Sequence, residues 1–431
     1  MDTLFRDTIF LDTENGSASR GDVMVRDGVI SSTGRFPGNV PEDCEVFEGR
    51  GSVLVMPGFV NSHTHAAMVL LRGFGEELPL REWLEKRIWP VEAGLTPEHV
   101  YWGSRGAILE MASTGTTCFA DMYFEMDEVA RAADESGMRC SLCRGIVGDD
   151  EKKILEGIDL YRKWDRKGLT RVFLGPHAPY TVPMETMRRL TAEGNSLGTG
   201  VHTHFLETEW EISYIRETFG LSPFSYLESS GLLGTPKTIL AHGVWIEKED
   251  LPLLEKSSVT IAHNPASNMK LGSGFAPLPS MLSSGVCVSL GTDGAASNNR
   301  LDMWGEMRLC TLIHKGQSKD PTVVTAKEVL RMATLEGARA AGFDDVGLIR
   351  EGWQADLVVV DLDSPQFQGW DMENIAGFLV YAGSSRDIIG TMVAGKWLYR
   401  RDRPDHEGQE ETMKQMARCR IELARAAGIV A

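Results

Sequence analysis

Histidines at the ends of apolar runs are the residues of this chain best placed to do chemistry. His63 and His65 are two positions apart where such a run ends, so their imidazoles point to one side of the strand and can bind one ion. His204 and Asp293 end two later runs of the same kind. Three imidazole nitrogens and one carboxylate oxygen suit zinc or ferrous iron and leave a coordination position for water. The sequence therefore predicts one divalent metal ion, with zinc favoured over ferrous iron.

Further ionisable residues end other predicted strands or follow them closely. Seven of the ten histidines lie at or just before a predicted strand end, His177 and His242 among them. Glu207 follows His204 by three positions, and Arg144 ends another run. In a parallel barrel these ends meet at one rim, where the functional site lies. His202 also forms an H-x-H pair with His204, and we interpret His202 as a packing neighbour of the ligand.

The strands that carry these residues alternate with helical stretches through the middle of the chain. The eight predicted strands are Leu54–Val60, Thr116–Asp121, Arg139–Val147, Arg171–His177, Gly200–Phe205, Thr238–His242, Val259–His263 and Val286–Asp293. Continuous apolar runs are typical of parallel strands that are covered on both faces. Eight strands alternating with helices predict an α/β protein, a (β/α)8 TIM-like barrel.

Both ends of the chain are rich in short predicted strands. Asp27-Gly28, between two apolar runs, predicts a hairpin, and residues 352–361 and 393–399 predict further strands. We therefore expect a small β-sandwich domain formed by residues 1–55 and 346–404, and a catalytic barrel at 56–345. The last segment, 405–431, predicts a helical tail that is exposed to solvent or packed on the barrel.

Charge and composition narrow the range of partners. The net charge of −17 argues against a nucleic acid, which requires a clustered positive surface. The apolar stretches are too short to cross a bilayer and no signal peptide is evident, so we expect a cytoplasmic protein without a membrane partner. Seven scattered cysteines fit reduced thiols. We interpret Cys140 and Cys143, a C-x-x-C pair in a predicted strand, as two packing thiols.

Several longer motifs resemble the amidohydrolase superfamily. Within it, they are similar to the 5-methylthioadenosine/S-adenosylhomocysteine deaminases, a family that includes 5′-deoxyadenosine deaminases. The matching segments are Met56–His65, Leu70–Gly73, Glu82–Leu84, Trp89–Glu92, Asp121–Tyr123, Gly175–Tyr180, His204–Thr208, His263–Gly272 and Leu290–Asn299. The resemblance extends over about residues 20 to 400.

The resemblance implies particular roles for the polar residues. Its metal ligands would be His63, His65, His204 and Asp293, and its substrate contacts Glu92, Arg144, His177, Glu207 and Asp293. The family often has a second arginine after the position of Arg144, where this chain offers only Lys152 or Lys153. A related subset bridges two metals with a lysine at the end of strand four, and Arg171–His177 contains none. We therefore expect one metal ion per subunit. As a separate expectation, the protein is a homo-oligomer, either a dimer or a tetramer.

The reaction implied is hydrolytic deamination of an adenosine-type nucleoside to the inosine analogue and ammonia. Asp293 would accept a proton from the attacking water, His242 would hold the nucleophile by a hydrogen bond, and Glu207 would donate a proton to N1 of the purine. Glu92 would accept hydrogen bonds from ribose hydroxyls, and His177 would contact the ribose or N3. The apolar pair Phe205-Leu206 predicts a raised pKa for Glu207.

Other interpretations stay open. Glu207 could be a surface carboxylate, His242 a structural histidine, and Arg144 a salt-bridge partner within the barrel. The same scaffold also fits a guanine or cytosine deaminase, a triazine chlorohydrolase or a non-catalytic relative. We expect His263 to cap or orient the loop Asn264–Asn268. The remaining histidines, interpreted as surface or packing residues, are His99, His314 and His406.

Overall fold

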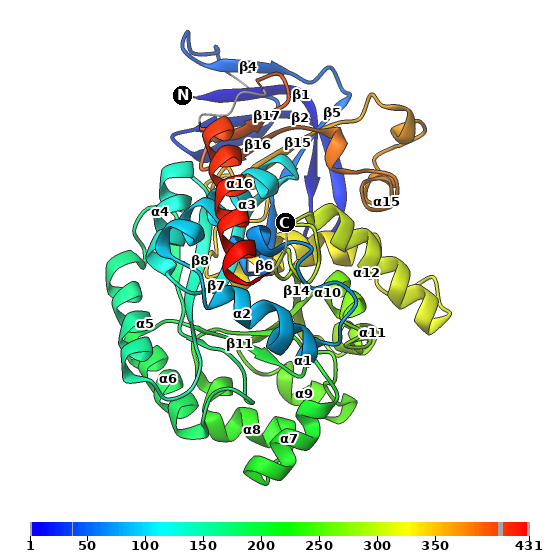
Figure 1. The fold of residues 1–431 in the computed structure, drawn as a ribbon. Helices are drawn as coiled ribbons and strands as arrows, with labels where there is room; N and C mark the ends of the chain where they lie inside the picture. Colours follow the sequence, from blue (N-terminus) through cyan, green and yellow to red (C-terminus); the bar gives the residue numbers. More distant parts are fainter. Residues whose placement is uncertain (1, 37, 404–407, 429–431) are drawn as a thin grey trace.

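The structure is a computed structural model that describes residues 2–36, 38–403 and 408–428. Strands from both ends of the chain join in one eight-stranded sheet (Figure 1), in the order β17-β16-β15-β5-β1-β2-β3 with β4 paired to β1. Its strands are β1 (Thr3–Asp12), β2 (Ser17–Arg26), β3 (Val29–Gly34), β4 (Glu45–Glu48), β5 (Val53–Pro57), β15 (Leu357–Asp361), β16 (Ile388–Val393) and β17 (Lys396–Arg400). The two strand-rich ends predicted from the sequence thus form one structural unit.

The predicted hairpin at Asp27-Gly28 is confirmed. Arg26 at the end of β2 pairs with Val29 at the start of β3, so only two residues form the turn. Asp27 and Gly28 have φ angles of 50° and 82°. Positive φ at both central residues is what a two-residue turn between right-twisted strands requires.

The middle of the chain forms the parallel barrel in two half-sheets. One contains β6 (Phe59–Thr64), β7 (Thr116–Tyr123), β8 (Arg139–Ile146), β9 (Thr170–Val172) and β10 (Gly175–Pro176), and the other β11 (Val201–Phe205), β12 (Thr238–His242), β13 (Val259–His263) and β14 (Cys287–Leu290). Leu174 bridges to Val201 on one side, and the Asp293 amide donates to the His63 carbonyl at 2.9 Å on the other. These two seams join the half-sheets.

The first predicted barrel strand, Leu54–Val60, is wrong in its bounds because it covers two strands. β5 pairs with β1 and β15 in the terminal sheet, whereas β6 pairs with β7 in the barrel. Gly58 alone separates them. A Cβ on Gly58 would lie 2.1 Å from Thr117 Cγ2, so only glycine fits where the chain passes between the two sheets. The predicted strand Arg171–His177 is likewise divided, into β9 and β10.

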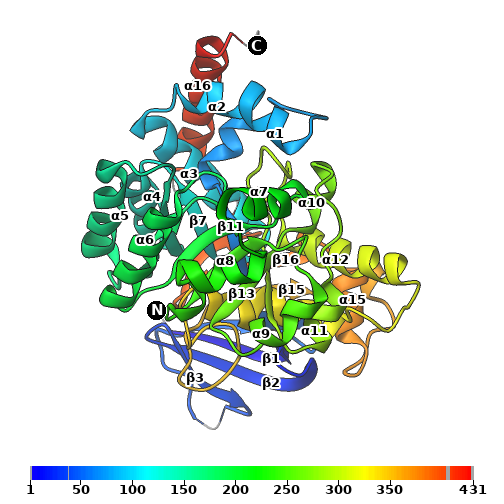
Figure 2. The same cartoon turned by 90° about the horizontal axis from the view of Figure 1, so that it is seen from below.

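Helices surround the barrel, as the two views in Figures 1 and 2 show. The α-helices are α1 (Leu80–Trp83), α2 (Trp89–Glu92), α3 (Pro97–Ser113), α4 (Met126–Ser136), α5 (Glu151–Trp164), α6 (Met184–Leu197), α7 (Trp210–Phe219), α8 (Pro223–Ser230), α9 (Leu251–Leu254), α10 (Pro265–Lys270), α11 (Leu278–Ser283), α12 (Met303–Ser318), α13 (Ala326–Arg331), α14 (Gly337–Ala340), α15 (Ile375–Tyr381) and α16 (Gln409–Ala426). Short 3-10 segments are η1 (Ala66–Leu71), η3 (Leu232–Gly234), η4 (Lys248–Asp250), η6 (Pro365–Phe367) and η7 (Ser385–Asp387), and π segments are η2 (Leu84–Ile88) and η5 (Met332–Glu336).

The C-terminal helix α16 packs on the barrel rather than extending into solvent (red in Figure 1). Arg418 donates to Glu98 at 2.5 Å and Arg420 donates to the Leu70 carbonyl at 2.9 Å, which ties α16 to α3 and η1. Cys419 and Leu423, on the helix itself, are buried. Because η1 directly follows His65, this helix covers the segment that leads out of the predicted metal site.

One buried ion pair links the barrel to the terminal sheet. Arg139 on β8 donates to both carboxylate oxygens of Asp356, at 2.6 and 2.9 Å, and Asp356 directly precedes β15. Their side chains are 5% and 0% exposed. Within the described ranges, no helix combines the length and apolar character needed to span a membrane.

Candidate metal centre

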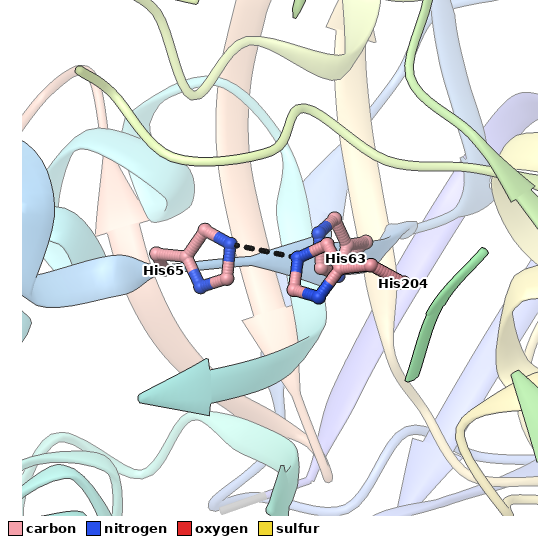
Figure 3. A group of neighbouring side chains, drawn as sticks. All are labelled: His63, His65 and His204. Carbon is pink, nitrogen blue, oxygen red and sulfur yellow. Dashed lines mark hydrogen bonds between the residues drawn. The ribbon is translucent and has the colours of Figure 1, made fainter. Parts of the chain in front are cut away.

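Three histidine side chains meet at the carboxyl end of the barrel (Figure 3). One possible ligand atom from each of His63, His65 and His204 lies within 4.8 Å of the others. The Nδ1 of His65 donates to the Met122 carbonyl at 2.5 Å, and that of His204 donates to the His177 carbonyl at 2.8 Å. These bonds leave the two Nε2 atoms facing each other at 3.3 Å, the contact drawn as a dashed line in Figure 3.

Asp293 completes this group from beyond β14. Its Oδ1 lies 3.2 Å from His65 Nε2 and 3.5 Å from His63 Nε2. The other oxygen, Oδ2, accepts hydrogen bonds from the hydroxyls of Ser267 and Ser297 at 2.6 and 2.7 Å. Burial favours the neutral acid, but hydrogen bonds and charge from the two histidines lower the pKa of Asp293 well below its usual value. Asp293 is therefore a fixed carboxylate with Oδ1 directed at the histidines.

The donor set fits a divalent cation. Nε2 of His63 is buried without a hydrogen-bond partner. Its Nδ1 lies 2.9 Å from His202 Nε2, so His202 holds the ring from behind. Burial lowers the pKa of His63 to about 4 and that of His204 well below its usual value, which keeps both rings in the neutral form that binds metal. At His65, burial alone would lower the pKa, but the hydrogen bond and charge of Asp293 raise it to about 9, so a cation bound here would displace a proton from that ring.

His242 and Glu207 lie beside this group. His242 Nδ1 donates to Asn268 Oδ1 at 2.8 Å, which leaves Nε2 as a hydrogen-bond acceptor 3.7 Å from Glu207 Oε2. Glu207 is 4% exposed, and its Oε1 has no hydrogen-bond partner. Burial, together with the nearby charge of Asp293, raises the pKa of Glu207 to about 8. At neutral pH the buried Glu207 is therefore an acid that still carries its proton.

A second buried carboxyl fixes the loop that carries Glu207. Glu211 accepts backbone hydrogen bonds from Leu206, Glu207 and Thr208, at 3.0, 2.9 and 3.1 Å. Leu206, with φ of 51°, is one of three non-glycine residues at this rim in the left-handed region; the others are His242 (76°) and Asp293 (62°). Such conformations cost free energy and persist where surrounding contacts impose them, as they do here.

A cavity of about 380 Å³ opens onto these groups. Its wall includes a group of imidazoles and carboxyls, namely His65, Glu92, His177, His204, Glu207, His242 and Asp293, while His63 lies behind them. Glu92 accepts a hydrogen bond from the Tyr123 hydroxyl at 2.8 Å, and burial raises its pKa. His177 Nδ1 lies 2.9 Å from the Thr181 hydroxyl, which itself donates to a carbonyl. This directs a proton to Nδ1 and leaves His177 Nε2 as an acceptor.

Arg144 is not part of this wall. Its guanidinium donates to Glu156 on α5 at 2.9 Å and stacks over Phe124 at 5.4 Å, in line with the salt-bridge interpretation. Lys153, in contrast, lines the cavity with its ammonium 3.5 Å from the Val147 carbonyl, whereas the Lys152 side chain is 84% exposed.

Several residues that support the site had no role in the sequence analysis. They are Asn268, which fixes the His242 ring, Ser267 and Ser297, which hold Asp293, and Glu211, which holds the Glu207 loop. Asn268 and Ser267 belong to the motif His263–Gly272, so their proximity to the site was signalled but not their partners. Glu211 gave no signal, because its function depends on how the chain turns after β11.

The other residues singled out by the sequence are structural. Cys140 and Cys143 are free, buried thiols on β8, as expected. The ring of His263 does not cap the loop after it but contacts His314 on α12, with their Nε2 atoms 3.1 Å apart. His99 is buried against Glu422 at 3.1 Å, and His406 lies outside the described residues.

A parallel barrel with histidines and an aspartate at its carboxyl rim is the architecture of a metal-dependent hydrolase. The chain belongs to the amidohydrolase family, which matches residues 54–398. The resemblance identified in the sequence is therefore confirmed.

Two relatives and one solved structure are similar to this chain over most of its length. The 5-methylthioadenosine/S-adenosylhomocysteine deaminase of Dictyoglomus thermophilum is 42% identical over 383 residues, 88% of this chain and 89% of that protein. The 5′-deoxyadenosine deaminase of Methanosarcina mazei is 43% identical over 396 residues, 90% of each chain. The crystal structure of an adenosine deaminase from Xanthomonas campestris with bound zinc is 32% identical, covers 98% of this chain and 99% of its own, and has a TM-score of 0.92. Together with the His/Asp group, these findings support a divalent metal ion.

Proposed function

We propose that this amidohydrolase removes the 6-amino group of adenosine-type nucleosides by hydrolysis and releases the inosine analogue and ammonia. The observation that carries the proposal is that one cavity joins a metal-binding group to a protonated acid, Glu207, and to the half-buried acceptor Glu92. The deaminase names of relatives about 43% identical to this chain support the same substrate class.

For the metal, we propose zinc held by His63, His65, His204 and Asp293. A bound divalent cation would lower the pKa of a water toward neutrality. Asp293 is suited to take the proton of that water, because it is ionised and its Oδ1 faces the histidines. The hydroxyls of Ser267 and Ser297 occupy Oδ2 and so keep the carboxylate from rotating.

Glu207 is the residue that would donate a proton to the purine. An acid with a pKa of about 8 carries its proton at neutral pH and can give it to N1 as the water adds to C6. His242 cannot supply that proton in its neutral form, because its own proton is on Nδ1 and bonded to Asn268. Its Nε2 instead accepts a hydrogen bond from the nucleophile and orients it.

The ribose would bind at the other end of the cavity. Glu92 keeps one oxygen for a sugar hydroxyl while Tyr123 holds the other. With its proton directed to Nδ1, His177 Nε2 would accept a hydrogen bond from a ribose hydroxyl, which favours the sugar over N3 as its partner. Arg144 would contribute indirectly, because its salt bridge to Glu156 anchors α5, the helix that carries Lys153.

The wider organisation follows the same proposal. We propose that residues 1–55 and 346–404 form a small β-sandwich domain beside the catalytic barrel at 56–345, and that 405–431 is a helical tail, of which residues 405–407 and 429–431 lie outside the described residues. The homo-oligomer, the cytoplasmic location and the absence of nucleic acid and membrane partners stay predictions.

The test is steady-state kinetics on four nucleosides: adenosine, 5′-deoxyadenosine, 5′-methylthioadenosine and S-adenosylhomocysteine. Loss of the adenine absorbance and release of ammonia are followed together for the nucleosides. The comparison substrates are guanine and cytosine, followed by ammonia release, and a chlorotriazine, followed by chloride release. We expect kcat/KM for the preferred nucleoside to exceed that of each comparison substrate by at least about 100-fold, since matched polar contacts discriminate at this level. Negligible turnover of all four nucleosides would reject the proposal.

A further inference from the structure

A second group of metal-binding side chains lies beside α10, apart from the candidate metal centre. It consists of His263 at the end of β13 and of Cys310 and His314 on α12. One possible ligand atom of each lies within 4.8 Å of the others. The three residues are 2%, 0% and 1% exposed, so this group is fully inside the protein.

Two local features bring these donors together. Cys310 and His314 are four residues apart, which places both on one face of α12. His263 is the last residue of β13, and its Nε2 lies 3.1 Å from His314 Nε2. The corresponding distance between His65 and His204 in the candidate metal centre is 3.3 Å.

The hydrogen bonding of the two imidazoles is incomplete. Nδ1 of His263 is buried without a hydrogen-bond partner, although buried polar atoms in proteins are normally paired. Two neutral imidazoles that meet through their Nε2 atoms can share only one proton, which satisfies one nitrogen on each ring. A cation bound by both Nε2 atoms would replace that shared proton and accept a lone pair from each ring.

We propose that His263, Cys310 and His314 bind one thiophilic cation, Zn²⁺ or Cu⁺, at a structural site separate from the candidate metal centre. Two imidazoles and one thiolate are donors that such ions prefer, whereas Mg²⁺ and Ca²⁺ require oxygen ligands. Complete burial leaves no route for a substrate, which gives the site a structural role.

The consequence for the enzyme is the anchoring of α10. This helix directly follows His263 and carries Ser267 and Asn268, the partners of Asp293 and His242. It already contacts α12 through the Ala266 amide, which donates to Glu306 at 3.0 Å. An ion that ties His263 to α12 would fix the start of α10 at a second point.

The experiment titrates the full-length, metal-stripped protein with Co²⁺ and reads both stoichiometry and thiolate-to-cobalt charge-transfer absorption. The candidate metal centre contains no cysteine, so a thiolate band reports only on the second site. We expect two Co²⁺ per chain with the band in the wild type, and one Co²⁺ without it in Cys310→Ser. Cys140→Ser, which removes a buried thiol on β8, should keep both ions and the band. The double variant His63→Ala/His65→Ala should keep the band and lose one ion, which separates this proposal from that for the catalytic centre.

Elemental analysis of the protein as purified then distinguishes zinc from copper. If Cys310→Ser fails to fold by circular dichroism, His314→Gln serves in its place and should also reduce the stoichiometry from two to one. A wild-type protein that binds one Co²⁺ without a thiolate band would overturn the proposal. A band that persists in Cys310→Ser would do so as well, because the thiolate would then belong to another cysteine.

Discussion

Replacing Glu207 by glutamine tests the proposed proton donor directly. Glutamine keeps the size and buried hydrogen-bonding capacity of the side chain but has no acidic proton. With a pKa of about 8, roughly nine in ten Glu207 carboxyls are protonated at pH 7. Because a positioned general acid contributes about 10²- to 10⁴-fold, we expect kcat/KM for the preferred nucleoside to fall by about that factor.

The pH dependence should change in the same variant. Wild-type kcat/KM should decline above about pH 8 as Glu207 ionises, and Glu207→Gln should lack this decline. The stability of the folded protein should fall over the same pH range. The pKa of Glu207 is raised from 4.5 to about 8 in the folded state, so the free energy of unfolding decreases as pH rises through this interval. At pH 7 this loss amounts to roughly 3 kcal/mol relative to acid pH, and the unfolding free energy of metal-free Glu207→Gln should lack this dependence on pH.

The assay is ammonia release between about pH 5.5 and 9.5, with urea unfolding of the metal-free protein at pH 5 and 7. Glu209→Gln is the matched control, since Glu209 is exposed two residues further on and should leave both measurements unchanged. If Glu207→Gln retained wild-type kcat/KM, or if the alkaline decline persisted in it, the assignment of Glu207 as proton donor would be refuted.

Three further changes follow from the structure. Asp293→Asn should abolish turnover while circular dichroism stays unchanged, and near-wild-type activity would contradict its role as base. Lys153→Met should reduce kcat/KM several-fold for S-adenosylhomocysteine, which carries a carboxylate, but not for 5′-methylthioadenosine. Lys152→Met should change kcat/KM for neither substrate, and equal effects of the two variants would exclude a role for Lys153 in binding the carboxylate. Asp356→Ala leaves the buried Arg139 guanidinium unpaired and should cost about 3–5 kcal/mol in chemical unfolding, so a loss below about 1 kcal/mol would contradict the contribution of this pair.

The regular part of the barrel could be predicted because each strand is an apolar run that ends at a polar residue. β12 and β13 have the predicted bounds, Thr238–His242 and Val259–His263. The division at Pro57-Gly58 could not be predicted in this way. The run is continuously apolar on both sides, and only the pairing of β5 with β1 and β15, and of β6 with β7, shows that the chain changes sheets there.

The candidate metal centre follows from local spacing, since His63 and His65 share one face of a strand whatever lies around them. The direction of Arg144 does not follow in this way. An arginine at a strand end can turn to the cavity or to the neighbouring helix, and here Glu156 on α5 determines which. The roles of Asn268 and Glu211 were hidden for the same reason, because each depends on a partner that only the folded chain brings near.

The two seams of the barrel have a consequence for how the enzyme assembles. His63 and His65 come from β6 in one half-sheet, whereas His204 comes from β11 in the other and Asp293 follows β14. An ion held by all four can therefore bind tightly only after the halves have closed on each other, and its binding free energy then opposes their separation. Binding of the cation would then be the last step of assembly. A chain that loses its cation should separate first at the two contacts between the half-sheets, Leu174–Val201 and His63–Asp293.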